Sequence, residues 1–103
     1  MSARTRGKCL ERRTAELYGG QRIGPTGRAD PDVVTPHLVI ECKRGYGLAI
    51  ESAWIEQARN ASRKRGLPWL IVHGTKGSSL HTVTMDEELA VRLLQESRMI
   101  EYD

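Results

Sequence analysis

The sequence PDVVTPHLVIECK, residues 31–43, predicts a β-hairpin that carries two acids and a lysine. Its apolar run Leu38–Ile40 is short, contains β-branched residues and is bounded by turn-forming residues, which favours a buried strand over a helix. The preceding run Val33–Thr35 supplies the partner strand. Residues 31–43 are therefore expected to form two paired strands.

The two acids of this hairpin are expected to face each other. Side chains alternate along a strand, so Glu41 and Lys43 share one face. A turn centred on residues 36–37 sets Asp32 opposite Glu41. Like charges across a strand pair destabilise a sheet, and a divalent cation between them is the simplest reason for such a pair. A three-residue turn would slip the register and send one of the acids to the other face.

The whole chain has 103 residues, which suits a single domain over residues 1–103 with one core. No apolar segment approaches the length that spans a bilayer, and residues 1–6 lack the apolar stretch of a signal peptide. We therefore expect an intracellular, cytoplasmic protein. Two cysteines, Cys9 and Cys42, do not suggest a disulfide scaffold, so both are expected to be reduced.

The charge is unevenly distributed along the chain. The formal net charge of +3 divides into +4 over residues 1–44 (nine Lys and Arg against five Asp and Glu), +3 over residues 45–80 (five against two) and −4 over residues 81–103 (two against six). The basic part contains the hairpin, which indicates a polyanionic partner bound without sequence information. A solvated basic surface is the alternative interpretation.

Periodicity and turn residues predict three helices and five strands. The helices are expected over residues 3–18, 49–65 and 86–97, and the strands over residues 21–23, 33–35, 38–43, 68–73 and 80–84. The last two helices carry apolar stripes, Ile50, Trp54, Ala58 and Ala61 on one and Leu89, Val91, Leu93 and Leu94 on the other, and both stripes are expected to pack. The order α-β-β-β-α-β-β-α predicts an α/β domain with a mixed central sheet flanked by helices.

A short Glu-x-Lys motif can occur by accident, but here it has a wider context. Gly7-x-x-x-Glu11-Arg12 lies on the first expected helix, a Gly-rich basic loop follows at residues 24–30, and Pro31-Asp32 precedes Glu41-Cys42-Lys43. Together these motifs resemble the PD-(D/E)XK nuclease superfamily, and more narrowly the archaeal and phage-type Holliday junction resolvases. The resemblance covers about residues 4–62 and implies a restriction-endonuclease-like fold.

The resemblance also implies roles for individual residues. Asp32 and Glu41 would bind Mg²⁺, for which Mn²⁺ can substitute, with the backbone carbonyl of Cys42 as a further ligand. Glu11 would reach the metal through a water molecule or a second metal ion. Lys43 would orient or activate the attacking water and offset charge at the phosphate. The helical residues that complete the catalytic set are Glu11 and Gln57.

This chemistry is reasonable without the resemblance. Hydrolysis of a phosphodiester brings an anionic nucleophile to an anionic phosphate, and an oxygen-ligated magnesium ion neutralises charge and lowers the pKa of bound water. The lysine can supply a fixed positive charge or, with a lowered pKa, take part in proton transfer. The sequence leaves both roles of Lys43 open.

DNA contacts are expected from basic residues around the hairpin and at the end of the second helix. They are Arg4, Arg6, Lys8, Arg12, Arg28, Arg44, Arg63 and Lys64. The loop over residues 24–28 is expected to touch DNA as well. The basic run 63–65 could instead be a solvated helix end that interacts with the helix dipole.

Each acid has a competitor or a simpler explanation. Glu16 lies on the same helix as Glu11, and Asp30 lies close to Asp32, although its position before a proline favours a loop. Glu41 and Lys43 could be an exposed pair on an edge strand. Other chemistries fail on spacing: the histidines and cysteines lack zinc spacing, and residues 74–79 lack the order of a phosphate-binding loop. The two tryptophans are expected in the core.

Together with the resemblance, the sequence predicts a magnesium-dependent, structure-selective DNA endonuclease, with a Holliday junction resolvase as the leading hypothesis; action as a homodimer is what the resemblance implies. A four-way junction needs paired cuts, which two copies of one small site can make. A restriction-like, nicking or flap-cleaving enzyme of the same superfamily is the first alternative. A non-catalytic DNA-binding module is the second.

Overall fold

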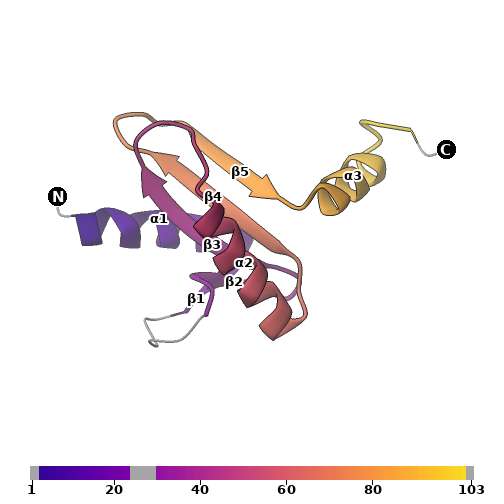
Figure 1. The fold of residues 1–103 in the computed structure, drawn as a ribbon, viewed down its shortest axis with the longest axis horizontal. Helices are drawn as coiled ribbons and strands as arrows, with labels where there is room; N and C mark the ends of the chain where they lie inside the picture. Colours follow the sequence, from indigo (N-terminus) through magenta and orange to yellow (C-terminus); the bar gives the residue numbers. More distant parts are fainter. Residues whose placement is uncertain (1–2, 24–29, 102–103) are drawn as a thin grey trace.

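The computed structural model describes residues 3–23 and 30–101, with side chains from Cys9 onward. Its elements are α1 (Ala3–Tyr18), β1 (Gln21–Arg22), β2 (Val33–Val34), β3 (Val39–Gly45), α2 (Ser52–Arg65), β4 (Trp69–Thr75), β5 (His81–Met85) and α3 (Glu87–Glu96). The strands form one sheet in the order β1-β2-β3-β4-β5 (Figure 1). Only β3 and β4 are parallel, and the other neighbours are antiparallel. The expected α/β domain with a mixed sheet is confirmed.

The β2–β3 hairpin has the predicted register. Val33 pairs with Ile40, and the Thr35 N–H donates to the Leu38 carbonyl at 3.0 Å. The Thr35 hydroxyl also accepts from the backbone N–H groups of His37 and Leu38 at 3.1 and 2.9 Å. A threonine oxygen that binds two turn amides fixes a two-residue turn and so prevents the one-residue slip.

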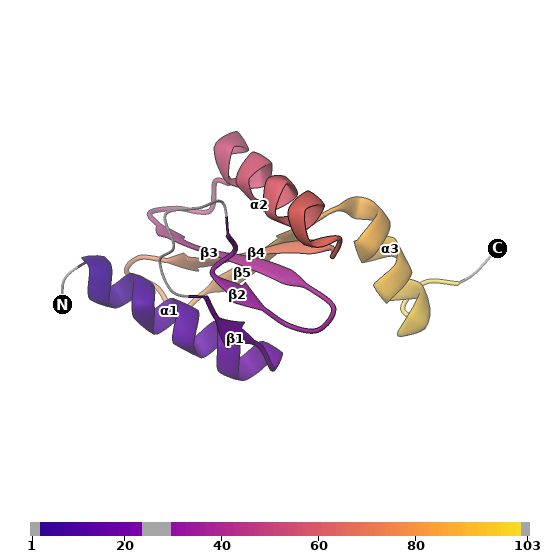
Figure 2. The same ribbon diagram turned by 90° about the horizontal axis from the view of Figure 1, so that it is seen from below.

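The sheet is covered on its two faces by α1 and α2, as Figure 2 shows. On the α1 face Leu10 packs with Val33, Ile40, Leu70 and Val72. On the α2 face the buried residues are Val39, Ala58, Ala61, Trp69 and Ile71, with Ile50 and Trp54 packed against them. The predicted apolar stripe of the second helix and the predicted core positions of both tryptophans are therefore confirmed.

The ends of the central elements differ slightly from the prediction. α2 begins at Ser52 rather than at residue 49, because Glu51 at its N-cap is extended (φ −75°, ψ 140°). It ends as expected at Gly66, whose φ of 67° is the left-handed conformation that glycine adopts easily. β4 extends to Thr75, two residues beyond the predicted strand. The turn between β4 and β5 is correspondingly shorter than expected.

α3 projects beyond the end of the sheet instead of flanking it (Figures 1 and 2). None of its residues is buried, and Val91, Leu93 and Leu94 are 39%, 45% and 37% exposed. The prediction that this stripe packs is therefore wrong except for Leu89, which contacts the α1-side core. Asp86 caps the helix by accepting from the Glu88 N–H at 2.9 Å, so the helix forms without being covered.

Within the described parts of the chain, no helix is long and apolar enough to cross a membrane.

Candidate active site at the end of the hairpin

Asp32 lies just before the first residue of β2, and its side chain continues the hydrogen bonding between the two strands. The Asp32 N–H donates to the Ile40 carbonyl at 3.1 Å. Its Oδ2 atom accepts from the Cys42 N–H at 2.8 Å. The register of the hairpin, continued by one residue, sets Asp32 across from Glu41. The predicted meeting of the two acids is therefore present in the structure.

Glu41 is a carboxylate buried in the middle of the sheet. It is 1% exposed, and neither of its carboxylate oxygens has a hydrogen-bond partner. Burial and, after it, the negative charge of Asp32 raise the pKa of Glu41 from 4.5 to about 8, while the positive charge of Lys43 opposes the shift. The simpler explanation of an exposed pair is excluded, because the Glu41 side chain is buried.

Glu11 brings a third acid to the site from α1. Burial raises the pKa of Glu11, and the charge of Asp32 raises it as well. The Arg22 Nη2 atom donates to Glu11 Oε2 at 3.2 Å and partly offsets that charge. Glu16, its competitor on the same helix, is exposed. Of the two acids, Glu11 is therefore the one whose charge meets that of Asp32.

Lys43 and Gln57 meet on the α2 face of the sheet. The Lys43 Nζ atom donates to Gln57 Oε1 at 2.6 Å. Lys43 follows Glu41 by two residues in β3, so both side chains point to the same face. α2 crosses this face, which explains how a residue fourteen positions further along the chain reaches the lysine. The structure thus brings together all five predicted catalytic residues.

Cys42 can contribute its carbonyl to this site but not a thiolate. In a strand the N–H and C=O of one residue point to the same edge, and the Cys42 N–H points to Asp32. The Cys42 carbonyl therefore faces the same edge of β3, beside the residues that precede β2. Burial raises the pKa of the Cys42 thiol to about 12, so the sulfur stays protonated. The side chain lies on the opposite face and packs against the α1-side core.

The donor set fits a hard divalent cation, although it is not assembled as a closed metal centre. Carboxylate and carbonyl oxygens are the ligands of magnesium and manganese, and the two unpartnered oxygens of Glu41 are buried acceptors without a donor. Among the described residues, no group of three or more His, Cys, Asp or Glu side chains is arranged to hold a metal ion. Glu11 forms an ion pair with Arg22, and one carboxylate oxygen of Asp32 accepts a hydrogen bond from the Cys42 N–H.

Asp30, the competitor of Asp32, is directed to the end of α2. Its Oδ1 atom lies 2.9 Å from Lys64 Nζ and 3.7 Å from Arg65 Nη2. These ion pairs hold the chain that enters the hairpin against the helix. Asp30 therefore positions the segment that carries Asp32, and Asp32 is the acid that meets Glu41.

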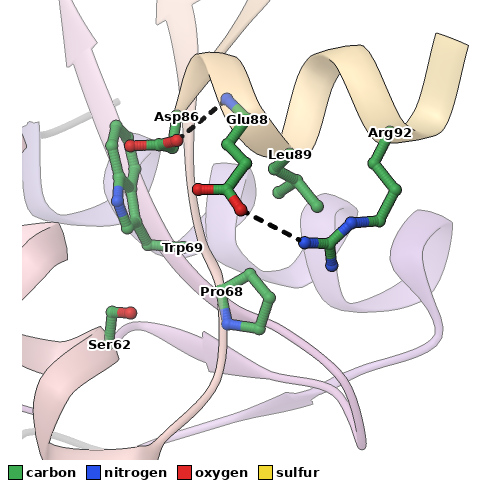
Figure 3. A pocket seen from close by; sticks show the side chains of 7 residues that line it. All are labelled: Ser62, Pro68, Trp69, Asp86, Glu88, Leu89 and Arg92. Carbon is green, nitrogen blue, oxygen red and sulfur yellow. Dashed lines mark hydrogen bonds and ion pairs between the residues drawn. The ribbon is translucent and has the colours of Figure 1, made fainter. Parts of the chain in front are cut away.

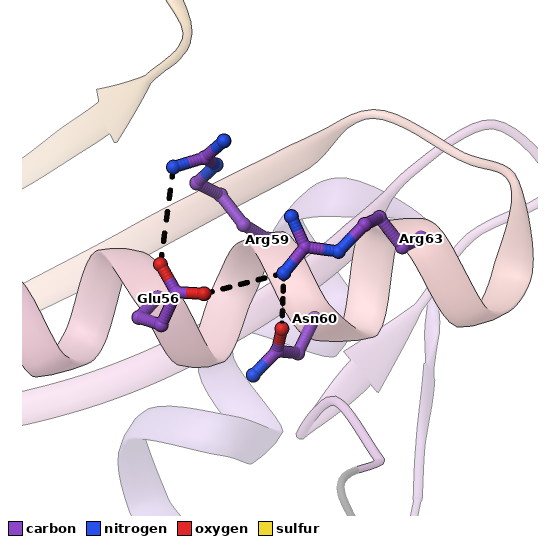
Figure 4. Close-up of polar contacts among 4 residues, drawn as sticks. All are labelled: Glu56, Arg59, Asn60 and Arg63. Atoms are coloured by element: carbon purple, nitrogen blue, oxygen red, sulfur yellow. Dashed lines mark hydrogen bonds and ion pairs between the residues drawn. The ribbon is translucent and has the colours of Figure 1, made fainter.

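The basic residues at the end of α2 are less available for DNA than predicted. Arg63 donates to Glu56 at 3.2 Å and to Asn60, and Glu56 also lies 3.8 Å from Arg59 (Figure 4). Lys64 is engaged by Asp30. Local acids thus offset part of the charge of both residues that were predicted to contact DNA.

The other predicted DNA contacts are spread over different surfaces. Arg12 is exposed on α1. The Arg44 side chain lies over Gly74. A Cβ atom added to Gly74 would lie 3.3 Å from Arg44 Nη1 and 3.4 Å from Leu10 Cδ1. Arg44 therefore lies on the α1 face, opposite Lys43, and its buried Nε has no partner. The side chains of Arg4, Arg6 and Lys8, and the loop over residues 24–28 with Arg28, lie outside the described residues.

Two polar residues near the site were missed by the sequence analysis. His73 pairs with Lys43 in the parallel register of β3 and β4, is 1% exposed and has no hydrogen-bond partner on either ring nitrogen. Its ring packs edge-on against Trp54 at 5.4 Å. Arg22, the partner of Glu11, was also missed. No sequence signal sets the register between strands joined through a helix, so the pairing of His73 with Lys43 could not have been found from the chain alone.

A cavity of about 270 Å³ lies away from these acids, beside the start of α3 (Figure 3). It is lined by Ser62, Pro68, Trp69, Asp86, Glu88, Leu89 and Arg92. Glu88 and Arg92 form an ion pair at 3.6 Å across one wall. None of the hairpin acids reaches this cavity, so it is a separate feature.

Comparison of the chain with protein-family models, with curated protein sequences and with solved structures gives no match. The functional interpretation therefore depends on the geometry of the site and on the motifs of the sequence.

Proposed function

We propose that the protein is a magnesium-dependent DNA endonuclease with a restriction-endonuclease-like fold, and that it cuts branched DNA as a Holliday junction resolvase does. One observation carries the proposal. Glu41 is a carboxylate at 1% exposure, with no hydrogen-bond partner, opposite a second carboxylate. In its ionised form such a group destabilises the fold unless a cation compensates it, and hydrolysis of phosphodiesters is a chemistry that needs a cation beside a lysine.

Asp32, Glu41 and the Cys42 carbonyl would hold the metal, with Glu11 as a more distant acid. When bound, a magnesium ion would neutralise phosphate charge and lower the pKa of coordinated water. Lys43 would donate to the phosphate or to the attacking water with the protons that Gln57 leaves free. Gln57 Oε1 accepts a hydrogen bond from one N–H of the ammonium at 2.6 Å and so fixes where the remaining two N–H groups point.

The alternative of a non-catalytic DNA-binding module is less well supported. Binding of a polyanion needs surface cations, not a buried acid pair, and two of the predicted surface cations are offset by local acids. A buried, unpartnered Glu41 is easier to understand as a residue kept for chemistry than as a residue kept for stability.

Paired cutting of a four-way junction would require two copies of the chain. A homodimer suits the approximate two-fold symmetry of the junction. The exposed apolar side chains of α3, Val91, Leu93 and Leu94, could supply part of such a contact.

Cleavage of synthetic four-way junctions, flaps and plain duplex in magnesium tests the proposal. Symmetrical nicks at the junction, with little cutting of plain duplex, are expected. Equal cutting of all three substrates would favour a restriction-like or nicking enzyme of the same chemistry. A protein that binds DNA and never cuts it with magnesium or manganese would contradict the proposed function.

A further inference from the structure

An exposed aromatic ring lies at the end of the strand that carries the candidate site. Tyr46 follows β3 directly and is 83% exposed, more than any other exposed large apolar side chain of the described residues. The Lys76 Nζ atom lies over its ring, 4.9 Å from the centroid. A single exposed apolar residue needs no explanation. An aromatic ring that is 83% exposed and lies beside a lysine offers both a stacking face and a positive charge to a ligand.

The two loops that carry this pair are held together. Lys76 N–H donates to the Gly45 carbonyl at 2.8 Å, which joins the loop after β3 to the loop after β4. Figure 1 shows both loops at the same end of the sheet, opposite α3. Leu48 and Leu80 are 59% and 46% exposed on the same two loops. We call the residues Tyr46, Leu48, Lys76 and Leu80 the Tyr46 tip.

The Tyr46 tip has the charge and the position expected of a surface that meets DNA. Residues 45–50 and 75–80 contain no acid and one lysine. Tyr46 is three residues beyond Lys43, which limits the distance between their Cα atoms to about 10 Å, and it lies past the last residue of β3, so strand alternation no longer sets the face of its side chain. That distance spans about three nucleotides of a DNA strand. A DNA strand whose phosphate lies at Lys43 would therefore bring a nearby base to the ring.

From these observations we infer that Tyr46 is a stacking platform for a DNA base that has lost a stacking neighbour, as occurs at a branch point, a gap or a flap, and that Lys76 binds the adjoining phosphate. The inference rests on the proposed function, because it assigns to the same site a means of selecting branched DNA over duplex. Bases in continuous duplex are stacked on both sides and offer no face to the ring. Stacking on an aromatic side chain is tolerant of base identity, so the platform selects structure, not sequence.

Equilibrium binding in EDTA tests this inference without involving cleavage. The probes are a plain duplex and the same duplex interrupted by a short single-stranded gap, with wild type, Tyr46→Ala, Tyr46→Phe and Leu17→Ala. Tyr46→Ala is expected to raise the Kd for gapped DNA about tenfold and to leave the Kd for duplex within about twofold. Tyr46→Phe keeps the ring and should bind as wild type. Leu17→Ala, at a side chain on α1 that is 65% exposed, is the matched control for loss of surface apolar area.

Equal affinity of wild type and Tyr46→Ala for gapped DNA would overturn the inference, and so would an equal loss on both probes. Melting curves of the variants keep the result interpretable, since a side chain that is 83% exposed should change the Tm little on truncation. If DNA binding depends on Tyr46 but the protein never cuts DNA, the result would support the stacking platform and contradict the proposed nuclease function. If the protein cuts DNA but its affinity for gapped DNA does not depend on Tyr46, the result would support the nuclease function and contradict the stacking platform.

Discussion

The β3 strand and α3 invert the usual placement of polar and apolar side chains in opposite ways. β3 holds Glu41 at 1% exposure without a hydrogen-bond partner, whereas α3 leaves Leu93 at 45% exposure. A buried unpartnered acid costs stability, and an exposed leucine forgoes stabilisation. The first departure lies where a lysine, a glutamine and two more acids converge. The second lies where no described residue covers the helix, so only the first combines with groups that can do chemistry.

The largest expected effect comes from removing the charge on β3. Glu41→Gln keeps the shape of the side chain and should lower the rate of magnesium-dependent nicking at least about a thousandfold, or about 4 kcal/mol. The same substitution should raise the Tm at pH 8, because it removes a buried charge that faces Asp32. Glu16→Gln, an exposed acid on α1, is the control and should change neither quantity. An active Glu41→Gln enzyme would show that the buried acid is structural.

The second effect concerns pH in the absence of metal. The folded state holds a proton on Glu41 that the unfolded chain releases near pH 4.5, because burial raises the pKa in the folded state to about 8. The resulting stability is fully present below pH 4.5 and is lost as pH rises through 8, and Glu11 shifts in the same direction. We expect a fall in the free energy of unfolding on the order of 4 kcal/mol between pH 5 and pH 8.5.

Thermal denaturation at a series of pH values, with and without magnesium, measures this fall. Magnesium should restore stability at pH 8.5 and have little effect at pH 5, because it binds the ionised carboxylates. Glu41→Gln should flatten most of the pH dependence and remove the magnesium effect. A wild-type Tm that does not change between pH 5 and pH 8.5 would contradict the burial of an ionisable Glu41.

A smaller effect is expected from the α2 side of the site. Gln57→Leu removes the acceptor for Lys43 and should reduce the nicking rate about tenfold, or about 1.4 kcal/mol. Gln57 is exposed, so the Tm should stay within a few degrees of wild type. Gln95→Leu on α3 provides the matched control. Unchanged kinetics of Gln57→Leu would indicate that the lysine is held by its strand alone.

The smallest effect is expected on α3. Leu93→Ser should change the free energy of unfolding by less than about 0.5 kcal/mol, because the side chain is 45% exposed. Ile71→Ala, in the core on β4, should cost about 2–5 kcal/mol in the same denaturant titration. A cost for Leu93→Ser that approaches the cost for Ile71→Ala would mean that a second molecule covers α3 in solution.

The sequence predicted those parts of the molecule that depend on local pattern. The hairpin register followed from a two-residue turn, which Thr35 fixes through two backbone contacts. The meeting of Asp32 and Glu41 followed from that register. The assignment of Glu11 over Glu16 needed the family pattern, and the structure provides the geometric reason, the proximity of Asp32 and Arg22.

What the sequence did not predict depends on contacts between distant segments. His73 lies beside Lys43 through a parallel register that a helical crossover sets. The ion pair between Lys64 and Asp30 joins residues 34 positions apart in the sequence. For α3 the apolar stripe was recognised correctly, but an amphipathic pattern predicts only that a face favours burial. It does not say whether the rest of the chain is close enough to bury it.

Binding of Mn²⁺ in the absence of DNA, followed by electron paramagnetic resonance at pH 8.5, tests the cation site most directly. Wild type should bind the ion, whereas Asp32→Asn and Glu41→Gln should lose most of that binding and Glu16→Gln should keep it. Binding by wild type should also weaken at pH 5, where Glu41 holds its proton. Equal Mn²⁺ binding by wild type and Glu41→Gln, or no binding by wild type at pH 8.5, would contradict a metal site at the end of the hairpin.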